Sequence, residues 1–129
     1  LYPDEQVFKS DSKIPYSGKF DLIFGDQLML FVSIDDVSSR MLTRRLLSLL
    51  KQHSGIRLNI YFVGKARDAG IREWARINQL PIDLPGIKGG ITLNHDQGRL
   101  NRMAGSEVSA PFLIRLRHGK AQAVTLNSV

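Results

Sequence analysis

The chain has no cysteine among its 129 residues. This absence excludes disulfide bonds within the chain, zinc sites built on cysteine and catalysis by a thiolate. It leaves the compartment open, because cysteine-free proteins occur both in the cytosol and in oxidising compartments. Long apolar runs are missing as well, and no stretch approaches the roughly 20 apolar residues of a membrane-spanning helix. We therefore expect no transmembrane segment in this chain.

The residues that are present are typical of one globular domain. Hydrophobic residues make up 43% of the chain and charged residues 23%, which is not the composition of a disordered protein. Lysine and arginine number 18 against 12 aspartates and glutamates. This excess permits binding to nucleic acid, to an anionic membrane surface or to an acidic partner. The basic residues are spread along the chain, so a solvated basic surface is the simpler interpretation.

The hydrophobic pattern predicts alternating strands and helices after an irregular first segment. Residues 1–27 are rich in turn-forming residues and predict an extended arm with one short strand near 20–24. The continuous apolar run 28–34 predicts a central strand buried on both faces. The remaining elements are predicted in order as a helix over 38–53, a strand over 57–63, a helix over 68–79, a strand over 91–94, a helix over 98–104, and strands over 112–116 and 121–126. Successive strands joined by a helix imply a parallel unit, and the last two strands imply an antiparallel hairpin.

Short polar residues mark the start of the first predicted helix. Asp35, Asp36 and Ser38 are candidates for its N-cap, and Gly55 is expected to end it. Its core-facing stripe consists of four leucines, at positions 42, 46, 49 and 50. Adjacent carboxylates such as Asp35 and Asp36 are also a candidate acid/base or metal pair, but capping is the simpler role for them.

The last third of the chain resembles the hairpin of the thioredoxin fold. Residues 109–112, Ser-Ala-Pro-Phe, resemble the cis-proline step that opens the first strand of that hairpin. Arg-His-Gly-Lys at 117–120 matches the turn that follows it. A proline at the start of a strand removes no hydrogen bond from the ladder. The resemblance implies a cis peptide bond before Pro111.

The resemblance extends over 28–126 and implies a thioredoxin-like three-layer α/β fold with a mixed central sheet. It divides the chain into an N-terminal extension, residues 1–27, and a thioredoxin-like domain, residues 28–129, on which the extension packs. The chain begins with leucine instead of methionine, so a piece of a longer protein is one interpretation. Thioredoxin domains normally end in a helix after the hairpin. Either such a helix was removed here, or residues 1–27 help to cover that face of the sheet.

In the redox members of this fold, two cysteines lie where the first central strand meets its helix, and their thiolates carry the chemistry. The equivalent residues here are Val37 and Arg40, within one position, and neither is a thiol. We therefore predict that the chain is not an enzyme and that its scaffold serves as a binding surface. That surface, the vestigial active-site edge, is defined by Asp36, Val37, Ser38, Ser39, Arg40, Ala110, Pro111 and Phe112. It is expected to place a helix N-terminus beside a free strand edge, which suits capture of an extended segment of a partner.

A narrower resemblance is carried by Leu-Phe-Val-Ser-Ile-Asp-Asp at 30–36, by the basic leucine-rich helix after it, and by the stretch from 60–64 to 110–112. These segments look like the thioredoxin-like accessory proteins of conjugative transfer, above all a family encoded in integrating conjugative elements. The resemblance implies a structural or adaptor component of a type IV secretion apparatus. It also implies a periplasmic location and other apparatus proteins as partners, and it names no reaction.

A different class of function remains open beside this one. Two helices carry arginines that could contact phosphates, which makes a basic nucleic-acid-binding module the alternative. No aromatic residues are interleaved with these arginines to support single-strand binding. The candidate basic surface consists of Arg44, Arg45, Arg72 and Arg76.

The remaining candidates predict no further chemistry, and we expect neither a metal nor a cofactor. The glycine-rich segment 86–90 lacks the Gly-Lys-Ser/Thr ending of a phosphate-binding loop. Trp74 is expected to anchor the core. No histidine has a partner at metal-ligand spacing, which applies to His53, His95 and His118.

Overall fold

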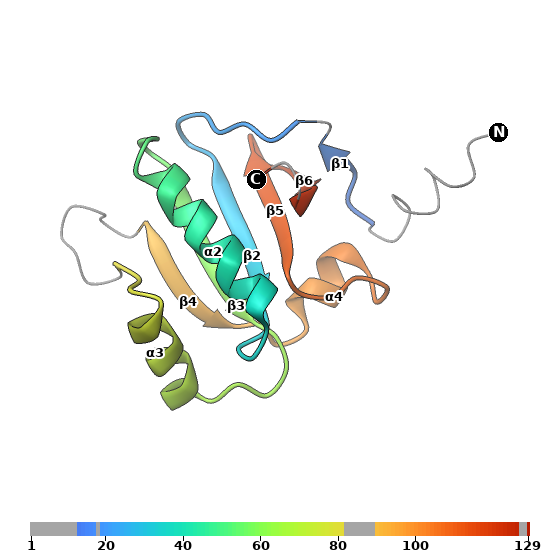
Figure 1. The fold of residues 1–129 in the computed structure, drawn as a ribbon. Coiled ribbons are helices and arrows are strands. Elements are labelled where there is room, and N and C mark those ends of the chain that lie inside the picture. Colours follow the sequence, from blue (N-terminus) through green and yellow to red (C-terminus); the bar gives the residue numbers. More distant parts are fainter. Residues whose placement is uncertain (1–12, 18, 82–89, 127–128) are drawn as a thin grey trace.

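The computed structural model describes residues 13–17, 19–81, 90–126 and 129. Figure 1 shows them as one sheet flanked by helices. The elements in chain order are β1 (Tyr16–Ser17), β2 (Gln27–Val32), α2 (Val37–Leu50), β3 (Arg57–Phe62), α3 (Asp68–Ile77), β4 (Ile91–His95), α4 (Arg99–Ala104), β5 (Phe112–Arg117) and β6 (Lys120–Val124).

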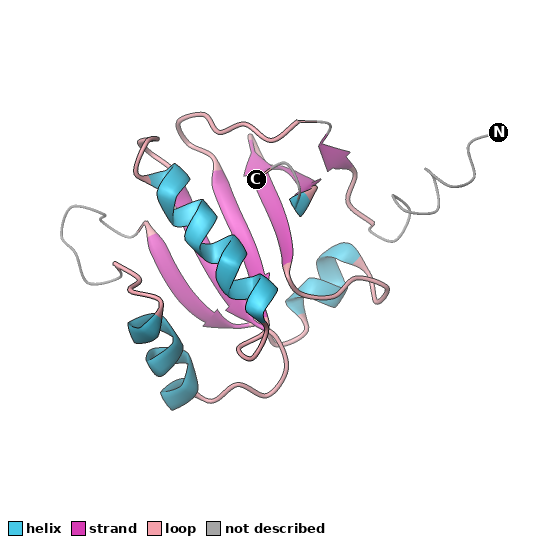
Figure 2. Cartoon of the chain, viewed as in Figure 1, coloured by secondary structure: helices cyan, strands magenta, loops and turns pink. Residues whose placement is uncertain are grey.

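The sheet has six strands in the order β1-β6-β5-β2-β3-β4, and Figure 2 separates them from the helices by colour. Strands β2, β3 and β4 run parallel to one another, and β5 is antiparallel to both β2 and β6. The short β1 adds to the outer edge of β6 in parallel. The predicted parallel unit, antiparallel hairpin and mixed sheet are therefore confirmed.

Helices cover both faces of the sheet. Leu42 and Leu46 of α2 and Trp74 of α3 belong to one core cluster, together with Leu30 of β2. The α4 helix and the alternate residues of β2 belong to the second cluster on the opposite face, which includes Met29, Phe31, Leu100 and Ala104. The predicted burial of the central strand on both faces is confirmed, because successive side chains of a strand point to opposite sides.

The strand predicted near 20–24 is wrong. The short strand lies earlier, at Tyr16–Ser17, and residues 20–24 form no strand. A tight turn takes its place, because the Asp26 backbone N–H donates to the Ile23 carbonyl while the Asp26 carboxylate accepts from the Ile23 N–H. Gly25, with φ at +95°, supplies the left-handed backbone that this turn requires.

The first predicted helix begins as expected but ends three residues early. It stops at Leu50 with Lys51 as its C-cap, and the next two residues form shorter hydrogen bonds, from Gln52 N–H to Leu49 and from His53 N–H to Leu50. These i to i−3 bonds tighten the last turn and end the α-helix. Gly55 therefore lies in the following loop and does not end the helix.

The face of the hairpin beside α2 is covered by the segment that precedes β2. Leu22 from this segment is buried in the same core cluster as α2. Asp21 receives hydrogen bonds from the buried Arg115 of β5, at 2.8 Å to its carbonyl and 2.5 Å to its carboxylate. Arg117 of the same strand donates to Asp26. Phe20 and Leu22 thus help to cover this face of the sheet.

None of the helices in the described ranges has both the length and the apolarity needed to cross a bilayer.

Candidate functional site

The vestigial active-site edge is assembled from two segments that the sheet brings together. Phe31 of β2 is paired with Phe112 of β5, so the loop that leaves β2 and the residues that enter β5 meet at one edge of the sheet. The peptide bond between Ala110 and Pro111 is cis, which confirms the expectation from the sequence. The start of α2 is tied to the same edge, because Ser33 N–H donates to the Ser39 hydroxyl at 3.1 Å.

The polar side chains at the start of α2 are occupied by capping. Asp36 is the N-cap residue and accepts a hydrogen bond from the Ser38 N–H, as predicted. The buried Ser39 hydroxyl donates to the same carboxylate at 3.1 Å. Asp35 is exposed. These bonds use the Asp36 oxygens to stabilise the helix.

Apolar side chains are exposed on the first turns of α2. Val37 is 55% exposed and Met41, one turn later, is 53% exposed. Residues four apart lie on the same side of a helix, so the two side chains form one small apolar surface beside the capped N-terminus. Met41 is a surface residue that the sequence reasoning missed. Its spacing of four from Val37 was the signal that could have found it.

The other predicted residues of the edge differ in how much they present to a partner. Ser38 is exposed, and Arg40, Ala110 and Pro111 are half-buried. Ser39 is fully buried and Phe112 is only 8% exposed. The side chains of Ser39 and Phe112 therefore pack beneath the surface of the edge and are not available for direct contact with a partner.

The expected free strand edge at this site is wrong. Strand β5 is paired on both sides, with β2 and with β6, because the hairpin folds back onto it. A hollow of about 330 Å³ lies beside Pro111 instead, and its lining includes Tyr16, Val108 and Val124. The edge thus offers a cis-proline step, a hollow and the apolar surface of Val37 and Met41.

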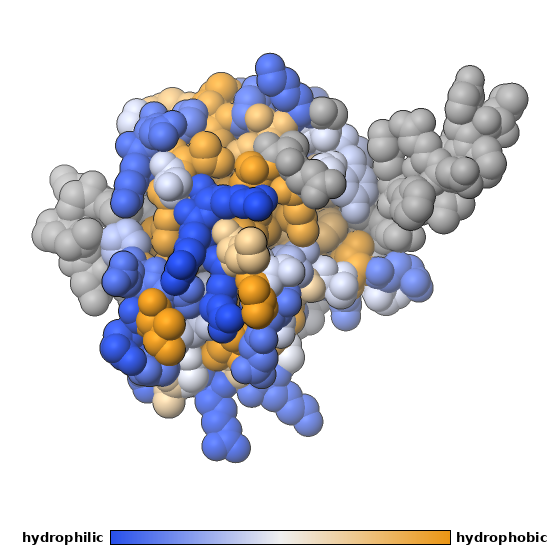
Figure 3. Space-filling model, in the orientation of Figure 1, coloured by the Kyte–Doolittle hydropathy of each residue, from blue (hydrophilic) through white to orange (hydrophobic). Residues whose placement is uncertain are grey.

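The four residues of the candidate basic surface lie on one layer of the molecule. Helices α2 and α3 pack on the same face of the sheet, and Figure 3 shows hydrophilic side chains gathered over them. Arg44, Arg45 and Arg72 are exposed. Arg76 is bound to Glu73 on the same helix, with Nε 3.0 Å from Oε2. This hydrogen bond lowers the pKa of Glu73. Because Glu73 neutralises part of its charge, Arg76 would attract an anionic partner less strongly than the other three arginines.

One titratable pair lies at the carboxyl ends of the parallel strands. His95 Nε2 is 2.5 Å from Asp68 Oδ1, and both side chains are exposed. The hydrogen bond from His95, followed by its charge, lowers the pKa of Asp68. Within the described ranges no three histidine, aspartate or glutamate side chains gather as metal ligands would. His53 and His118 are exposed and separate, and the glycine-rich segment 86–90 lies outside the described residues apart from Gly90.

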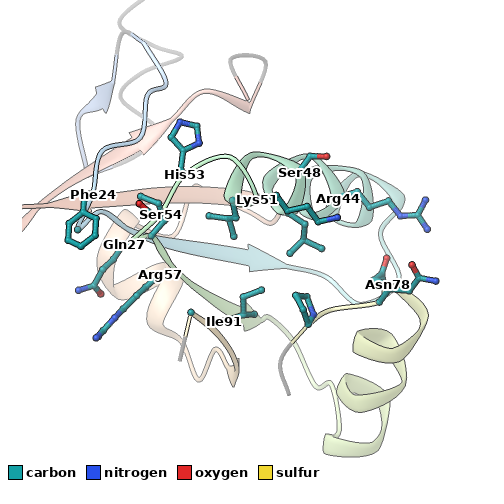
Figure 4. A pocket seen from close by; sticks show the side chains of 18 of the residues that line it. Phe24, Gln27, Arg44, Ser48, Lys51, His53, Ser54, Arg57, Asn78 and Ile91 are labelled. Atoms are coloured by element: carbon teal, nitrogen blue, oxygen red, sulfur yellow. The ribbon is translucent and has the colours of Figure 1, made fainter. Parts of the chain in front are cut away.

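A second and larger hollow, of about 1360 Å³, lies at the opposite edge of the sheet (Figure 4). Its walls come from the last turns of α2 and α3 and from the first residues of β2, β3 and β4. Sequence reasoning did not find it, because its residues are far apart in the chain. We call it the α2–α3 hollow, and its described lining includes Phe24, Arg44, Leu47, Lys51, Arg57, Ile77 and Asn78.

The arrangement of strands, the helices on both faces and the cis-proline before β5 together decide the fold. This chain has a thioredoxin-like fold. Its similarity is to a thioredoxin domain of a thiol-disulfide oxidoreductase from Bacteroides vulgatus, with a TM-score of 0.52, 16% identity, and coverage of 76% of this chain and 67% of that one. It is also similar to MTB dsbF, with a TM-score of 0.53 and 11% identity, and the match covers 82% of this chain and 76% of that one. A third similar structure is a domain of a possible thiol-disulfide isomerase from Cytophaga hutchinsonii. Its TM-score is 0.53 at 13% identity, and the match covers 84% of this chain and 72% of that one.

These likenesses concern the fold alone, because the identities are low. The names of all three structures refer to thiol-disulfide chemistry or to oxidised and reduced forms. The present chain has no cysteine and cannot form a disulfide with its own residues. No protein-family model matches the chain, and no curated protein matches it.

Proposed function

We propose that this chain is a non-catalytic thioredoxin-like protein that binds another protein through its vestigial active-site edge. The observation that carries the proposal is the exposed apolar pair Val37 and Met41 on the helix that would bear the redox residues. Large apolar side chains that are exposed together are typical of interaction sites. The absence of cysteine supports a binding role over thiol chemistry.

The partner class follows from the segments that resemble conjugation accessory proteins. We propose that the chain is a structural or adaptor component of an integrating conjugative element, within its type IV secretion apparatus. A periplasmic location belongs to the same proposal. The support is the similarity of segments 30–36 and 60–64 and of the cis-proline segment 110–112 to those proteins.

Photocrosslinking tests the binding surface directly. A photoreactive amino acid is introduced at Val37 in cells that carry the native element, and crosslinked products are identified by mass spectrometry. The matched control carries the same group at Arg45, an exposed position later on the same helix. We expect an apparatus protein crosslinked from Val37 and absent from Arg45. The proposal fails if both positions give the same products, or if neither gives an apparatus protein.

Loss-of-binding variants must avoid the buried residues of the edge. Phe112 is only 8% exposed, so Phe112→Asp would disturb folding and binding together. Val37→Asp combined with Met41→Asp changes exposed positions only, and charged side chains there oppose an apolar contact. Because Val37 is changed in this variant, the photoreactive group is placed at Arg40. We expect the unmodified chain to crosslink the partner from Arg40 and the folded double variant to lose this crosslink.

The nucleic-acid alternative is favoured by one observation, the common layer of α2 and α3. Arg44, Arg45 and Arg72 are exposed on that layer. Contacts to phosphates would make the affinity fall steeply with salt, because bound cations release counterions from the nucleic acid. Fluorescence anisotropy with labelled DNA at low and at physiological salt tests this. Weak binding that is independent of salt, or no binding, excludes the alternative.

A further inference from the structure

The α2–α3 hollow lies at the opposite edge of the sheet from the vestigial active-site edge. Gln27, Arg57 and Ile91 are the first residues of the parallel strands β2, β3 and β4, and all three line the hollow. The vestigial active-site edge lies at the carboxyl end of β2. The two surfaces are therefore separate, and a ligand in one does not block the other.

Every ionisable side chain among the described lining residues is basic. Arg44 and Lys51 come from α2, His53 from the loop after it and Arg57 from β3. Figure 4 shows these four side chains around the hollow. No carboxylate in the described ranges forms an ion pair with Arg44, Lys51 or Arg57. Unpaired cations around a concave surface attract an anionic ligand, and the concave shape focuses their field.

The same hollow also offers apolar surface. Phe24 is 80% exposed and Ile77 is 55% exposed, and both line the hollow. The half-buried Leu47 lies between Arg44 and Lys51 in the sequence and also lines the hollow. A purely anionic ligand, such as a phosphate, would leave these apolar side chains in contact with water. A ligand that carries apolar groups beside its negative charges fits the lining better.

Asn78 forms a fixed part of the wall of the hollow. Asn78 lines the hollow and is only 5% exposed. Its Nδ2 donates to the Trp74 carbonyl at 2.8 Å, which fixes the orientation of the amide. Nothing in the described ranges donates a hydrogen bond to Asn78 Oδ1, although buried polar atoms are normally paired.

We propose that the α2–α3 hollow binds an acidic peptide segment of a partner protein, with apolar side chains between its carboxylates. The carboxylates lie against Arg44, Lys51 and Arg57, and an apolar side chain packs on Leu47 and Ile77. The proposal goes beyond the proposed function, because it concerns a second surface and a ligand of defined charge.

The probes are short fluorescein-labelled peptides in which glutamate alternates with leucine or phenylalanine, and binding to the 129-residue chain is followed by fluorescence anisotropy. Three comparison probes define the chemistry: the same peptides with lysine for glutamate, with serine for the apolar residues, and a labelled oligothymidine. We expect saturable binding of the acidic apolar peptides only, weakened by salt because the contacts are ionic.

Charge reversal on α2 locates the site. Arg44→Glu combined with Lys51→Glu is expected to weaken peptide binding at least about tenfold, because like charges replace attractive ones. Arg45→Glu is the matched control on the neighbouring exposed residue outside the hollow, and it should change the affinity less than about twofold. Ile77→Ser, also at an exposed position, should weaken binding without charge change. Circular dichroism verifies that each variant is folded.

Each contrary result overturns the proposal. It is wrong if no acidic apolar peptide binds saturably, or if the serine or lysine peptides bind as tightly. It is equally wrong if Arg45→Glu has the effect of the double variant. Tighter binding of oligothymidine that is lost in the double variant would assign the hollow to nucleic acid instead. Because Val37→Asp with Met41→Asp should leave peptide binding unchanged, failure of this proposal is distinguishable from failure of the proposed function.

Discussion

Replacing Asp26 by asparagine removes a charge that is almost completely buried and that joins the segment before β2 to the hairpin. Only 1% of Asp26 is exposed. Its Oδ1 accepts a hydrogen bond from Arg117 Nε at 2.8 Å, and its Oδ2 accepts from Arg117 Nη2 at 2.7 Å and from the Ile23 N–H at 2.9 Å. Asparagine keeps the size of the side chain and loses its charge.

The expected cost follows from the surroundings of the pair. Breaking a fully buried ion pair costs about 3–5 kcal/mol. The Arg117 side chain is 24% exposed and also lies 3.2 Å from Asp21, so water and Asp21 recover part of that loss. Asparagine can still accept the bond from Ile23. We therefore expect Asp26→Asn to lower the free energy of unfolding by about 2 kcal/mol, which is a large part of the roughly 5–15 kcal/mol of a small domain.

Urea unfolding followed by tryptophan fluorescence measures this loss. Trp74 is the sole tryptophan of the chain, and it is buried with its ring edge-on to Phe62 at 5.0 Å between centroids. Its emission should shift when the core opens. For a slope of about 1–3 kcal/mol per molar urea, the midpoint should fall by about 1 M. Asp35→Asn, the same change at an exposed carboxylate, should cost less than about 0.5 kcal/mol.

The pH dependence gives a second readout of the same variant. Burial by itself raises the pKa of Asp26, but hydrogen bonds from Arg117 and the Ile23 N–H, with the charge of Arg117, outweigh burial and lower it. The stability that Asp26 contributes is therefore complete above its unfolded pKa of about 3.9 and is lost as the pH falls through the lower folded value. The difference between the unmodified chain and Asp26→Asn should shrink below about pH 4. A loss under about 0.5 kcal/mol at neutral pH, or a difference that persists in acid, would show that the Asp26–Arg117 pair does not stabilise the fold as its burial implies.

Two further substitutions test local features of the fold by the same urea assay. Asp36→Ala removes the N-cap of α2 and should cost about 1 kcal/mol, and an unchanged midpoint would show that the cap contributes nothing. Gly119→Ala places a methyl group at φ +77° in the hairpin turn and should cost about 1 kcal/mol. His118→Gly, at φ +53° in the same turn, should cost little or stabilise, and the reverse order of these two effects would contradict the left-handed turn.

Local patterns were sufficient to predict most of the fold. The apolar run at 28–34 is continuous because β2 is buried on both faces, and that is a property of sequence alone. The leucine spacing of α2 and the capping aspartate are equally local. The cis bond before Pro111 was expected from the resemblance of residues 109–112 and 117–120 to the thioredoxin hairpin.

The segment before β2 could not be predicted, because distant residues determine it. Asp21 and Asp26 pair with Arg115 and Arg117, more than 90 positions along the chain. The mainly apolar residues at 20–24 suggested a strand. The two aspartates instead fix this segment in a turn that packs on the face of the sheet beside α2. One signal was present: alternation places Arg115 and Arg117 on the same face of β5 as the buried Leu113.

The fold brings together the two segments of the vestigial active-site edge, but the exposure of their side chains could not be predicted. The resemblance located the edge at 36–40 and 110–112, yet it gave no means of separating the exposed Val37 from the buried Ser39 and Phe112. The α2–α3 hollow depends on where the ends of two helices and three strands meet. That arrangement exists only once the chain has folded, so no motif could reveal it.

The most direct test of the central claim is the frequency of conjugative transfer from cells that lack this gene in their native element. Complementation compares the unmodified gene with the folded variant that combines Val37→Asp and Met41→Asp. We expect a large loss of transfer on deletion, restored by the unmodified gene and not by the variant. Normal transfer without the gene, or full restoration by the variant, would contradict the assignment of function to the vestigial active-site edge.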